Sequence, residues 1–312
     1  MATWNRPMTV FAGVMGVMGF ISLGGLFFDD RILLGAPIWL KPFKFAVSFA
    51  IYCLTWAWLT SKLTRGKRLA NRVAAGLVAL LAAEYVIIAT QTVRGRPSHF
   101  NVATPFDRTL YVIMGVSAAG LWIGTMALTV PLLRQPIADT ASRLAIRIGM
   151  VISVVGIGLG ALMVTRPAGQ AGAQGVIGAH TVGARDGGPG MPITGWSTIG
   201  GDLRIPHFVG MHALQALPLF VVLLGLLARR FPRLGFDTVR GRLVWIAGGV
   251  YGGLVALVTW QALRGQSLIH PDGLTLTALG VLVGAALATT VLTLAPSPRR
   301  AAVEPRSEEV VR

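Results

Sequence analysis

The stretch HTVGARDGGPGMPITGWSTIGGDLRIPHFVGMHALQ (residues 180–215) separates two long apolar segments and contains three of the five histidines of the chain. Glycine and proline occur too densely here for a regular helix or strand, yet a simple linker would not need histidine, aspartate and tryptophan. We therefore expect an ordered, irregular loop that leads into a helix carrying His212 and Gln215. The fold depends on what lies on either side of this loop.

On both sides the chain is strongly apolar. Of its 312 residues, 54% are hydrophobic and 13% are charged, and the mean hydropathy is +0.66, whereas a soluble domain has about 25% charged residues. The sequence predicts an all-α, eight-helix integral membrane bundle, a multi-pass protein with the lipid bilayer as its first partner. The runs long enough to cross about 30 Å of hydrocarbon are residues 8–28, 44–60, 70–93, 109–132, 146–165, 206–228, 243–263 and 273–295.

The charge distribution predicts the orientation. The formal net charge is +16, but 18 of the basic residues fall in one set of alternate loops and 10 in the other. The positive-inside rule then places the N- and C-termini in the cytoplasm and residues 166–205 outside it. No basic soluble domain remains to hold a nucleic acid, so we exclude that class of partner. The single Cys53 excludes a disulfide within the chain and a cysteine-based metal site.

Two predicted helix ends have similar sequences. Residues 91–101 (QTVRGRPSHFN) and 261–272 (QALRGQSLIHPD) both read Gln-x-x-Arg-Gly, followed by Ser and His and then by Asn or Asp. They lie four spans apart, so the match preserves direction through the membrane and predicts two parallel four-helix halves. The predicted domains are residues 1–140, residues 141–295 with the extracytoplasmic loop 166–205, and a disordered cytoplasmic tail, residues 296–312.

Glu84 is an ionisable residue inside a predicted span. It lies ten residues before Arg94, which is about 15 Å along a helix, so its carboxyl group must be neutral or paired and should face the bundle interior. Gln91 lies on the same stripe two turns closer to the outside, and the two could line a polar track. The alternative is a protonated Glu84 that is hydrogen-bonded to a neighbouring helix. We take Glu84, Gln91 and Asp202 as candidate catalytic residues, although Asp202 is slightly better suited to capping the helix that follows it.

All five histidines fall on predicted outer loops or on the outermost turns of helices. Histidine is the commonest metal ligand and titrates near neutral pH, so the pattern predicts a His-rich site on the extracytoplasmic side. The preferred hypothesis is a haem- or metal-binding membrane oxidoreductase acting on a quinone or another small hydrophobic substrate, because imidazoles on facing helices ligate haem and arginines pair with its propionates. The candidate cofactor-binding residues are His99, His207, His212, His270, Arg94, Arg204 and Arg264.

Two other functions fit the same region. In a metal-dependent hydrolase, a divalent metal would activate a water molecule beside Asp202. The metal ligands would be His180, His207, His212 and Asp186. In a small-molecule or proton-coupled transporter, Glu84 would lie on the path and the loop would form the outer gate. The structural alternative is that each histidine satisfies a backbone group of the loop, so the sequence leaves open whether haem, a metal or neither is bound.

Two lysines flank the start of the second apolar run, in the sequence WLKPFKF (residues 39–45). Proline suits the first turn of a helix, and tryptophan and lysine suit the membrane interface. Lys41 and Lys44 either extend to lipid phosphates or form an anion site at the outer face.

Several motifs together resemble those of a group of uncharacterised bacterial multi-pass membrane proteins. They are HTVG, DGGPG, GWS, GDLRIPHF and HALQ in the loop, RGRPSHFNVATPFD (residues 94–107) and WLKPFKFAVSF (residues 39–49). This resemblance implies a location in a bacterial plasma (inner) membrane and no particular activity. The architecture of two halves with outward histidines is also similar to that of haem A synthase, a membrane haem oxidoreductase whose ligands lie in even-numbered helices of both halves. Predicted helices 2, 4 and 8 carry no histidine here, so this similarity concerns architecture alone.

Overall fold

The computed structural model describes residues 4–137, 139–165 and 175–295, and the predicted tail and residues 166–174 of the loop lie outside them. The described chain is all-α apart from two short ribbons, which confirms the predicted fold class. The helices are α1 (Arg6–Phe28), α2 (Leu40–Ser61), α3 (Lys67–Val93), α4 (Pro105–Leu133), α5 (Thr140–Leu159), α6 (Leu162–Thr165), α7 (Arg204–Met211), α8 (Ala213–Leu227), the 3-10 helix η1 (Pro232–Gly235), α9 (Asp237–Leu263) and α10 (Gly273–Leu294). The antiparallel strand pairs are β1 (Ile32–Leu33) with β2 (Ala36–Pro37) and β3 (Thr181–Val182) with β4 (Gly201–Asp202).

Seven helices of the described chain are long and apolar enough to cross a membrane: α1, α2, α3, α4, α5 continued by α6, α9 and α10. Together α7 and α8 form one further candidate span, which is bent by 47°. Each of the eight predicted apolar runs corresponds to one of these spans. The chain is therefore a multi-pass helical membrane protein, while its orientation and its division into two repeated halves stay predictions.

The sixth predicted span is broken, where the sequence indicated one helix over residues 206–228. In a continuous helix the Met211 carbonyl would accept the N–H of Gln215. Here the Met211 carbonyl accepts a hydrogen bond from Ser153 Oγ of α5 at 2.8 Å, and the Gln215 N–H bonds the His212 carbonyl at 3.0 Å. A tertiary hydrogen bond thus replaces a helical one, and the chain bends at His212.

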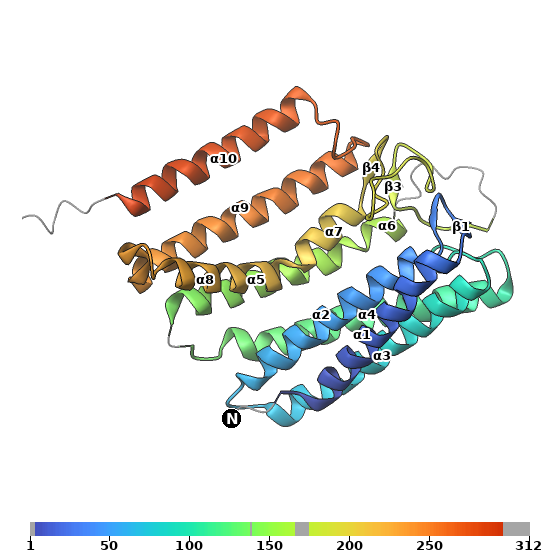
Figure 1. Cartoon of the computed structure of the whole chain (residues 1–312), viewed down its shortest axis with the longest axis horizontal. Coiled ribbons are helices and arrows are strands. Elements are labelled where there is room, and N and C mark those ends of the chain that lie inside the picture. Colours follow the sequence, from blue (N-terminus) through green and yellow to red (C-terminus); the bar gives the residue numbers. More distant parts are fainter. Residues whose placement is uncertain (1–3, 138, 166–174, 296–312) are drawn as a thin grey trace, which may run out of the picture.

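The helices form two groups that share one core (Figure 1). In the first group α1 packs on α2 and α3, and α3 packs on α4; in the second, α5 packs on α7, α8 and α9, and α10 packs on α9. Gly156 and Gly210 bring α5 and α7 so close that a Cβ on either would touch the other's backbone. The main core around Trp56 also contains Met150 and Leu214 of the second group, so it joins the two groups.

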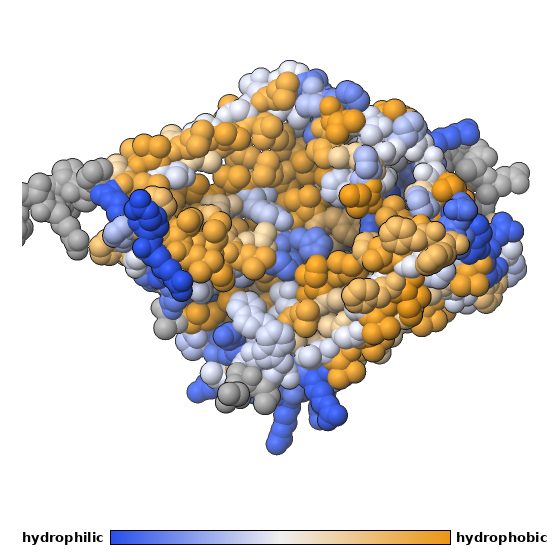
Figure 2. Space-filling view, viewed as in Figure 1, coloured by the Kyte–Doolittle hydropathy of each residue, from blue (hydrophilic) through white to orange (hydrophobic). Residues whose placement is uncertain are grey.

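Large apolar side chains cover the outside of the bundle. Phe20, Phe28 and Leu292 are at least three quarters exposed, and Figure 2 shows apolar surface over much of the face in view. Apolar surface of this extent is unfavourable in water and fits the hydrocarbon of a membrane. The structure therefore supports contact with a lipid bilayer.

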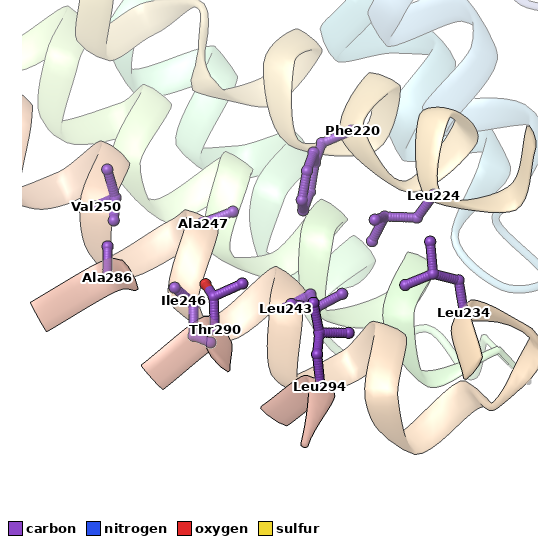
Figure 3. A pocket seen from close by; sticks show the side chains of 10 residues that line it. All are labelled: Phe220, Leu224, Leu234, Leu243, Ile246, Ala247, Val250, Ala286, Thr290 and Leu294. Carbon is purple, nitrogen blue, oxygen red and sulfur yellow. The ribbon is translucent and has the colours of Figure 1, made fainter. Parts of the chain in front are cut away.

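An apolar cavity of about 380 Å³ lies between α8, η1, α9 and α10 (Figure 3). The side chains that line it are Phe220, Leu224, Leu234, Leu243, Ile246, Ala247, Val250, Ala286, Thr290 and Leu294. Apart from the Thr290 hydroxyl they are apolar, so this cavity offers no group for acid–base or metal chemistry.

The loops that join the helices at one end form a cap, and we call this end the lid end and residues 175–203 the lid. It lies away from the N-terminus and from the end of α10 (Figure 1). Gly201 packs directly on the carbonyl of Ala262 at the end of α9, and Gly187 packs on Leu34 in the β1–β2 hairpin. The lid is therefore held by close backbone contacts on both groups of helices.

Candidate functional site

His180 and Asp186 form a hydrogen-bonded pair in the lid. The Asp186 carboxylate accepts the ring Nδ1–H of His180 at 2.7 Å and the backbone N–H groups of His180 and Thr181 at 3.0 and 2.9 Å. Burial would raise the pKa of Asp186, but these hydrogen bonds outweigh it and hold the pKa below its usual range. Because Asp186 is an ionised acceptor, Nδ1 carries the ring proton and Nε2 is left as the basic nitrogen.

The lid places the ring of His99 beside that of His180. The two ring centroids are 6.5 Å apart with their planes at 29°, and Ser98 Oγ lies 3.2 Å from His99 Nδ1. Burial and the charges of Lys41 and His180 hold the pKa of His99 well below its usual range, and burial likewise lowers the pKa of His180. Both imidazoles are therefore neutral at neutral pH, with Nε2 free of hydrogen bonds to other described residues.

Phe100 fixes the geometry of this pair. Its ring centroid is 4.8 Å from that of His180 and 6.1 Å from that of His99, and its backbone has φ +59°. A bulky residue in this left-handed region costs roughly 1–3 kcal/mol and persists only where the surroundings demand it. Gly178 leaves the space for the Phe100 ring, which a Cβ would fill.

Lys41 and Glu84 lie on the helices beneath the histidines. Lys41 is in the first turn of α2, and its Nζ lies 6.0 Å from the centroid of the Phe45 ring, one turn further into the helix. It is therefore directed along the helix into the bundle. Glu84 of α3 is 5% exposed, which confirms that it faces the bundle interior, and its charge interacts with that of Lys41.

Neither Glu84 nor the Lys41 ammonium forms a hydrogen bond to another described residue. The structural alternative for Glu84, a protonated carboxyl bonded to a neighbouring helix, is thus not found in the described chain. The charge of Lys41 also interacts with those of Arg204 and Asp186 and with that of His99. Through Lys41, the buried Glu84 is thus linked electrostatically to the lid, where the His180 side chain is 16% exposed.

Gln91 does not belong to the groups that interact with Lys41 and Glu84. Its Nε2 donates to Asp107 Oδ1 at 2.8 Å, and Arg94 Nη1 donates to both Gln91 Oε1 and Asp107 Oδ1 at 2.6 and 2.7 Å. Arg94 also lies 4.6 Å from the centre of the Phe106 ring. Gln91 and Arg94 therefore close the α3–α4 turn, and neither is free to contact a haem propionate in this conformation.

The other helix end with the same motif is built the same way. Gln261 Nε2 donates to the Ser267 carbonyl at 2.8 Å, and Arg264 pairs with Asp272, which caps α10. Gly95 and Gly265 both have positive φ, at 66° and 73°, as the αL residue that ends a helix requires. The shared motif thus has a shared structural use in closing a turn, which is a more economical account of Arg264 than a propionate clamp.

The remaining histidines do not converge on this site as one ligand set. His207 Nδ1 lies 2.8 Å from the Gly156 carbonyl. His212 lies at the bend, with Nδ1 3.3 Å from Gln215 Oε1. His270 Nδ1 lies 3.2 Å from a lid carbonyl, that of Thr198.

Within the described chain, no three His, Cys, Asp or Glu side chains are grouped as a metal site would require. The structure therefore does not group the predicted ligand set around one metal; the set is His180, His207, His212 and Asp186. Asp186 accepts two backbone N–H groups, and His212 lies at the α7–α8 bend beside Gln215. The histidine pair that does form, His99 with His180, combines one residue from each predicted set.

Asp202 and Arg204 form an ion pair that is hydrogen-bonded to the backbone of the lid. Asp202 is 1% exposed, pairs with Arg204 at 2.6 Å, and accepts the backbone N–H of Ser197 at 2.7 Å. Asp202 Oδ1 also accepts the N–H of Arg204, the first residue of α7, at 3.0 Å. The capping role considered for Asp202 is therefore present, while its predicted catalytic role stays a prediction.

Sequence reasoning left the roles of the two lysines open. Lys44 Nζ donates to the Thr194 carbonyl at 2.7 Å and so ties the lid to α2. Lys41 lies in the first turn of α2 and Lys44 just after it, near the positive end of the helix dipole, which disfavours a cation. The hydrogen bond of Lys44 shows that it contacts the lid, while the two alternatives for Lys41, lipid phosphate or an anion site, stay predictions.

No family model, curated protein or solved structure matches this chain, and what its own helices establish is a multi-pass helical membrane protein.

Proposed function

We propose that this chain is a proton-coupled membrane transporter whose substrate, a small molecule, binds beneath the lid beside Lys41 and Glu84. The observation that carries the proposal is Glu84, a carboxyl group inside a span that is 5% exposed and has no hydrogen-bond partner among the described residues. An ionisable residue inside a membrane is costly and usually marks a substrate or proton pathway. Among the described residues, Lys41 is the one charged group that interacts electrostatically with Glu84.

The histidine pair supplies a route for the proton. His180 reaches solvent at the lid end, His99 lies beside it, and Lys41 lies between His99 and Glu84 in the chain of interacting charges. A neutral imidazole with a free Nε2 can accept a proton, and because the pKa of both rings is lowered, each releases that proton readily to the next group. A proton taken up at His180 can therefore be passed inward when a substrate or water bridges the groups.

The bent α7–α8 span also favours transport. Broken helices near the middle of the membrane are a common feature of transporter binding sites. At the bend, His212 contacts Gln215, and Gln215 Nε2 donates to Thr55 Oγ1 of α2 at 3.0 Å. This polar contact joins the two groups of helices and is a suitable place for them to move against each other.

The test is proton movement in proteoliposomes that contain a pH-sensitive dye. A panel of small organic acids, amines and neutral solutes is added outside, and the response of protein-free liposomes is subtracted. We expect at least one solute to change the internal pH with the native protein and with Asp30→Asn, an exposed carboxyl at the same end, but not with Glu84→Gln. An undiminished response in Glu84→Gln would contradict the proposal.

A second candidate is the haem- or metal-binding oxidoreductase, and one observation favours it. Two imidazoles on opposite sides of one metal ion have ring centres roughly 6 Å apart, and the rings of His99 and His180 are 6.5 Å apart. A quinone would then be a suitable hydrophobic substrate. The absorption spectrum and the metal content of the purified protein test this candidate, which predicts a haem band or one bound metal per chain that is lost in His99→Ala.

A further inference from the structure

The start of α2 gathers positive charge at the lid end. Lys41 lies in the first turn, which has no acidic residue, and Lys44 lies just after it. The amino end of a helix adds the positive end of its dipole. Arg204 interacts with both lysines. Three cations and a helix dipole in a partly buried region require compensating negative charge.

Most charges here already have a partner. Arg204 is paired with Asp202, Lys44 donates to the Thr194 carbonyl, and Asp186 is held by His180 and by two backbone N–H groups. Lys41 is the exception, because its three N–H donors have no acceptor among the described residues.

Glu84 is the complementary exception. The residue is 5% exposed, and within the part of the chain that the structure describes its carboxyl group has no donor and interacts with one charge, that of Lys41. The two groups interact without a hydrogen bond, so each has room for a further partner. A partly exposed ammonium and a carboxyl group on a residue that is 5% exposed, neither with a hydrogen-bond partner among the described residues, can both bind a further group.

We propose that Lys41 binds the carboxylate of a small organic anion and that Glu84 takes up one proton when the anion binds. This inference rests on the proposed function and names its substrate class. Before binding, the positive charge of Lys41 balances the negative charge of Glu84. After binding, it balances the anion, and Glu84 is neutral. If both anions stayed ionised beside one ammonium, the site would carry an excess negative charge in a region of low dielectric.

The surroundings favour a monoanion with a flat apolar body. The Lys41 ammonium lies above the Phe45 ring, and the ring of His99 meets that of Phe45 edge to face at 5.7 Å. Phe100 completes this aromatic wall. One ammonium matches one carboxylate, and the ring faces suit an aromatic or aliphatic group attached to it.

No other charged group near Glu84 replaces Lys41 in this exchange. The elements packed on α3 are α1, α2 and α4. The single charged residue of α1 is Arg6, at the opposite end of the bundle, and those of α2 are Lys41 and Lys44. On α4, Asp107 forms an ion pair with Arg94. The other charged residue of α4, Arg108, is exposed. The ionisable groups above Lys41 are His99, His180, Asp186 and Arg204.

The test is calorimetric binding of benzoate to the full chain in lipid nanodiscs. Titrations in buffers with different ionisation enthalpies count the protons taken up, and benzamide serves as the neutral analogue. We expect one proton per benzoate and a Kd that rises about tenfold for each pH unit above the range in which Glu84 is protonated. Benzamide should bind at least tenfold more weakly.

Two variants separate the roles. Glu84→Gln should still bind benzoate, with no proton uptake and a Kd independent of pH, which a loss of folding would not produce. Lys41→Met should lose benzoate binding, whereas Lys62→Met should keep it. Lys62 is a matched control because it lies at the other end of α2, with Nζ 5.6 Å from the Trp58 ring.

Four results would each overturn the inference. They are benzoate binding without proton uptake, equal binding of benzamide, benzoate binding retained in Lys41→Met, and no benzoate binding at about pH 5. These results differ from failure of the proposed function. If Glu84→Gln abolishes proton movement driven by an amine or a neutral solute and benzoate does not bind, the transporter stands and its substrate is not an anion. If Glu84→Gln leaves all proton movement intact, the proposed function fails as well.

Discussion

Replacing Asp186 with Asn tests how the lid holds the ring of His180. Asp186 accepts three hydrogen bonds, from the His180 ring and from the N–H groups of His180 and Thr181. An asparagine oxygen in the place of Oδ2 can still accept both donors of His180. The Thr181 N–H then faces the asparagine NH2 in place of Oδ1, so two donors, that N–H and the NH2, lack an acceptor. A buried unsatisfied donor costs about 1–3 kcal/mol. Because the Asp186 side chain is 13% exposed, water can reach part of the site, and we expect the lower part of the summed range, about 2–3 kcal/mol.

Hydrogen–deuterium exchange measures this loss directly. A cost of about 2–3 kcal/mol corresponds to an increase in lid exchange of roughly 30- to 150-fold, confined to peptides that cover residues 180–203. Asp30→Asn is the matched control, because Asp30 is exposed at the same end, and it should leave exchange unchanged. Lid exchange within about threefold of the native value in Asp186→Asn would refute the reasoning.

Three further predictions concern the lid. Burial lowers the pKa of His180, so the folded lid binds fewer protons than the open lid. The protection of lid amides from exchange should therefore be full above the ordinary histidine pKa of about 6.5 and should fall as the pH drops below it. Lid protection that does not change with pH would contradict this. Lys44→Met removes the donor to Thr194 and should speed lid exchange about tenfold, since a hydrogen bond to a charged group contributes about 1.5–3 kcal/mol, while leaving the melting temperature nearly unchanged. Gly201→Ala places a methyl group on the end of α9 and should lower the Tm by several degrees, whereas Gly273→Ala, which has open space around it, should not.

The spans could be predicted from the sequence because length and hydropathy alone decide whether a segment can cross a membrane. The predicted run 70–93 and helix α3 end at the same residue. The bend at His212 could not be predicted in this way. It arises because Ser153, on another helix, takes the Met211 carbonyl, and no local pattern in residues 206–228 encodes that contact.

The candidate site was only partly predictable. The position of Glu84 inside a span and the gathering of histidines at one end follow from topology. The pairing of His99 with His180 depends on the course of the lid, which brings together residues from two distant loops. The His180 hydrogen bond to Asp186 was equally hidden, because the Asp-Gly-Gly-Pro-Gly sequence after Arg185 indicates a turn but not which backbone groups the carboxylate will accept.

The repeated Gln-x-x-Arg-Gly motif was visible in the sequence, but its structural use was not. The motif is plain in the sequence, and its chemistry suggested a cofactor clamp. In the structure, Arg94 and Arg264 are each paired with an aspartate of the next helix. A residue that can bind a ligand also suits a turn, and the sequence alone does not distinguish these uses.

The most direct test of the central claim is whether Glu84 exchanges a proton inside the bundle. Infrared difference spectroscopy of the protein in nanodiscs, between about pH 5 and about pH 9, detects the carbonyl band of a protonated carboxyl group. The account predicts a band that disappears as the pH rises, that is shifted by benzoate, and that is present in Asp30→Asn but absent from Glu84→Gln. Identical difference spectra for the native protein and Glu84→Gln would contradict it.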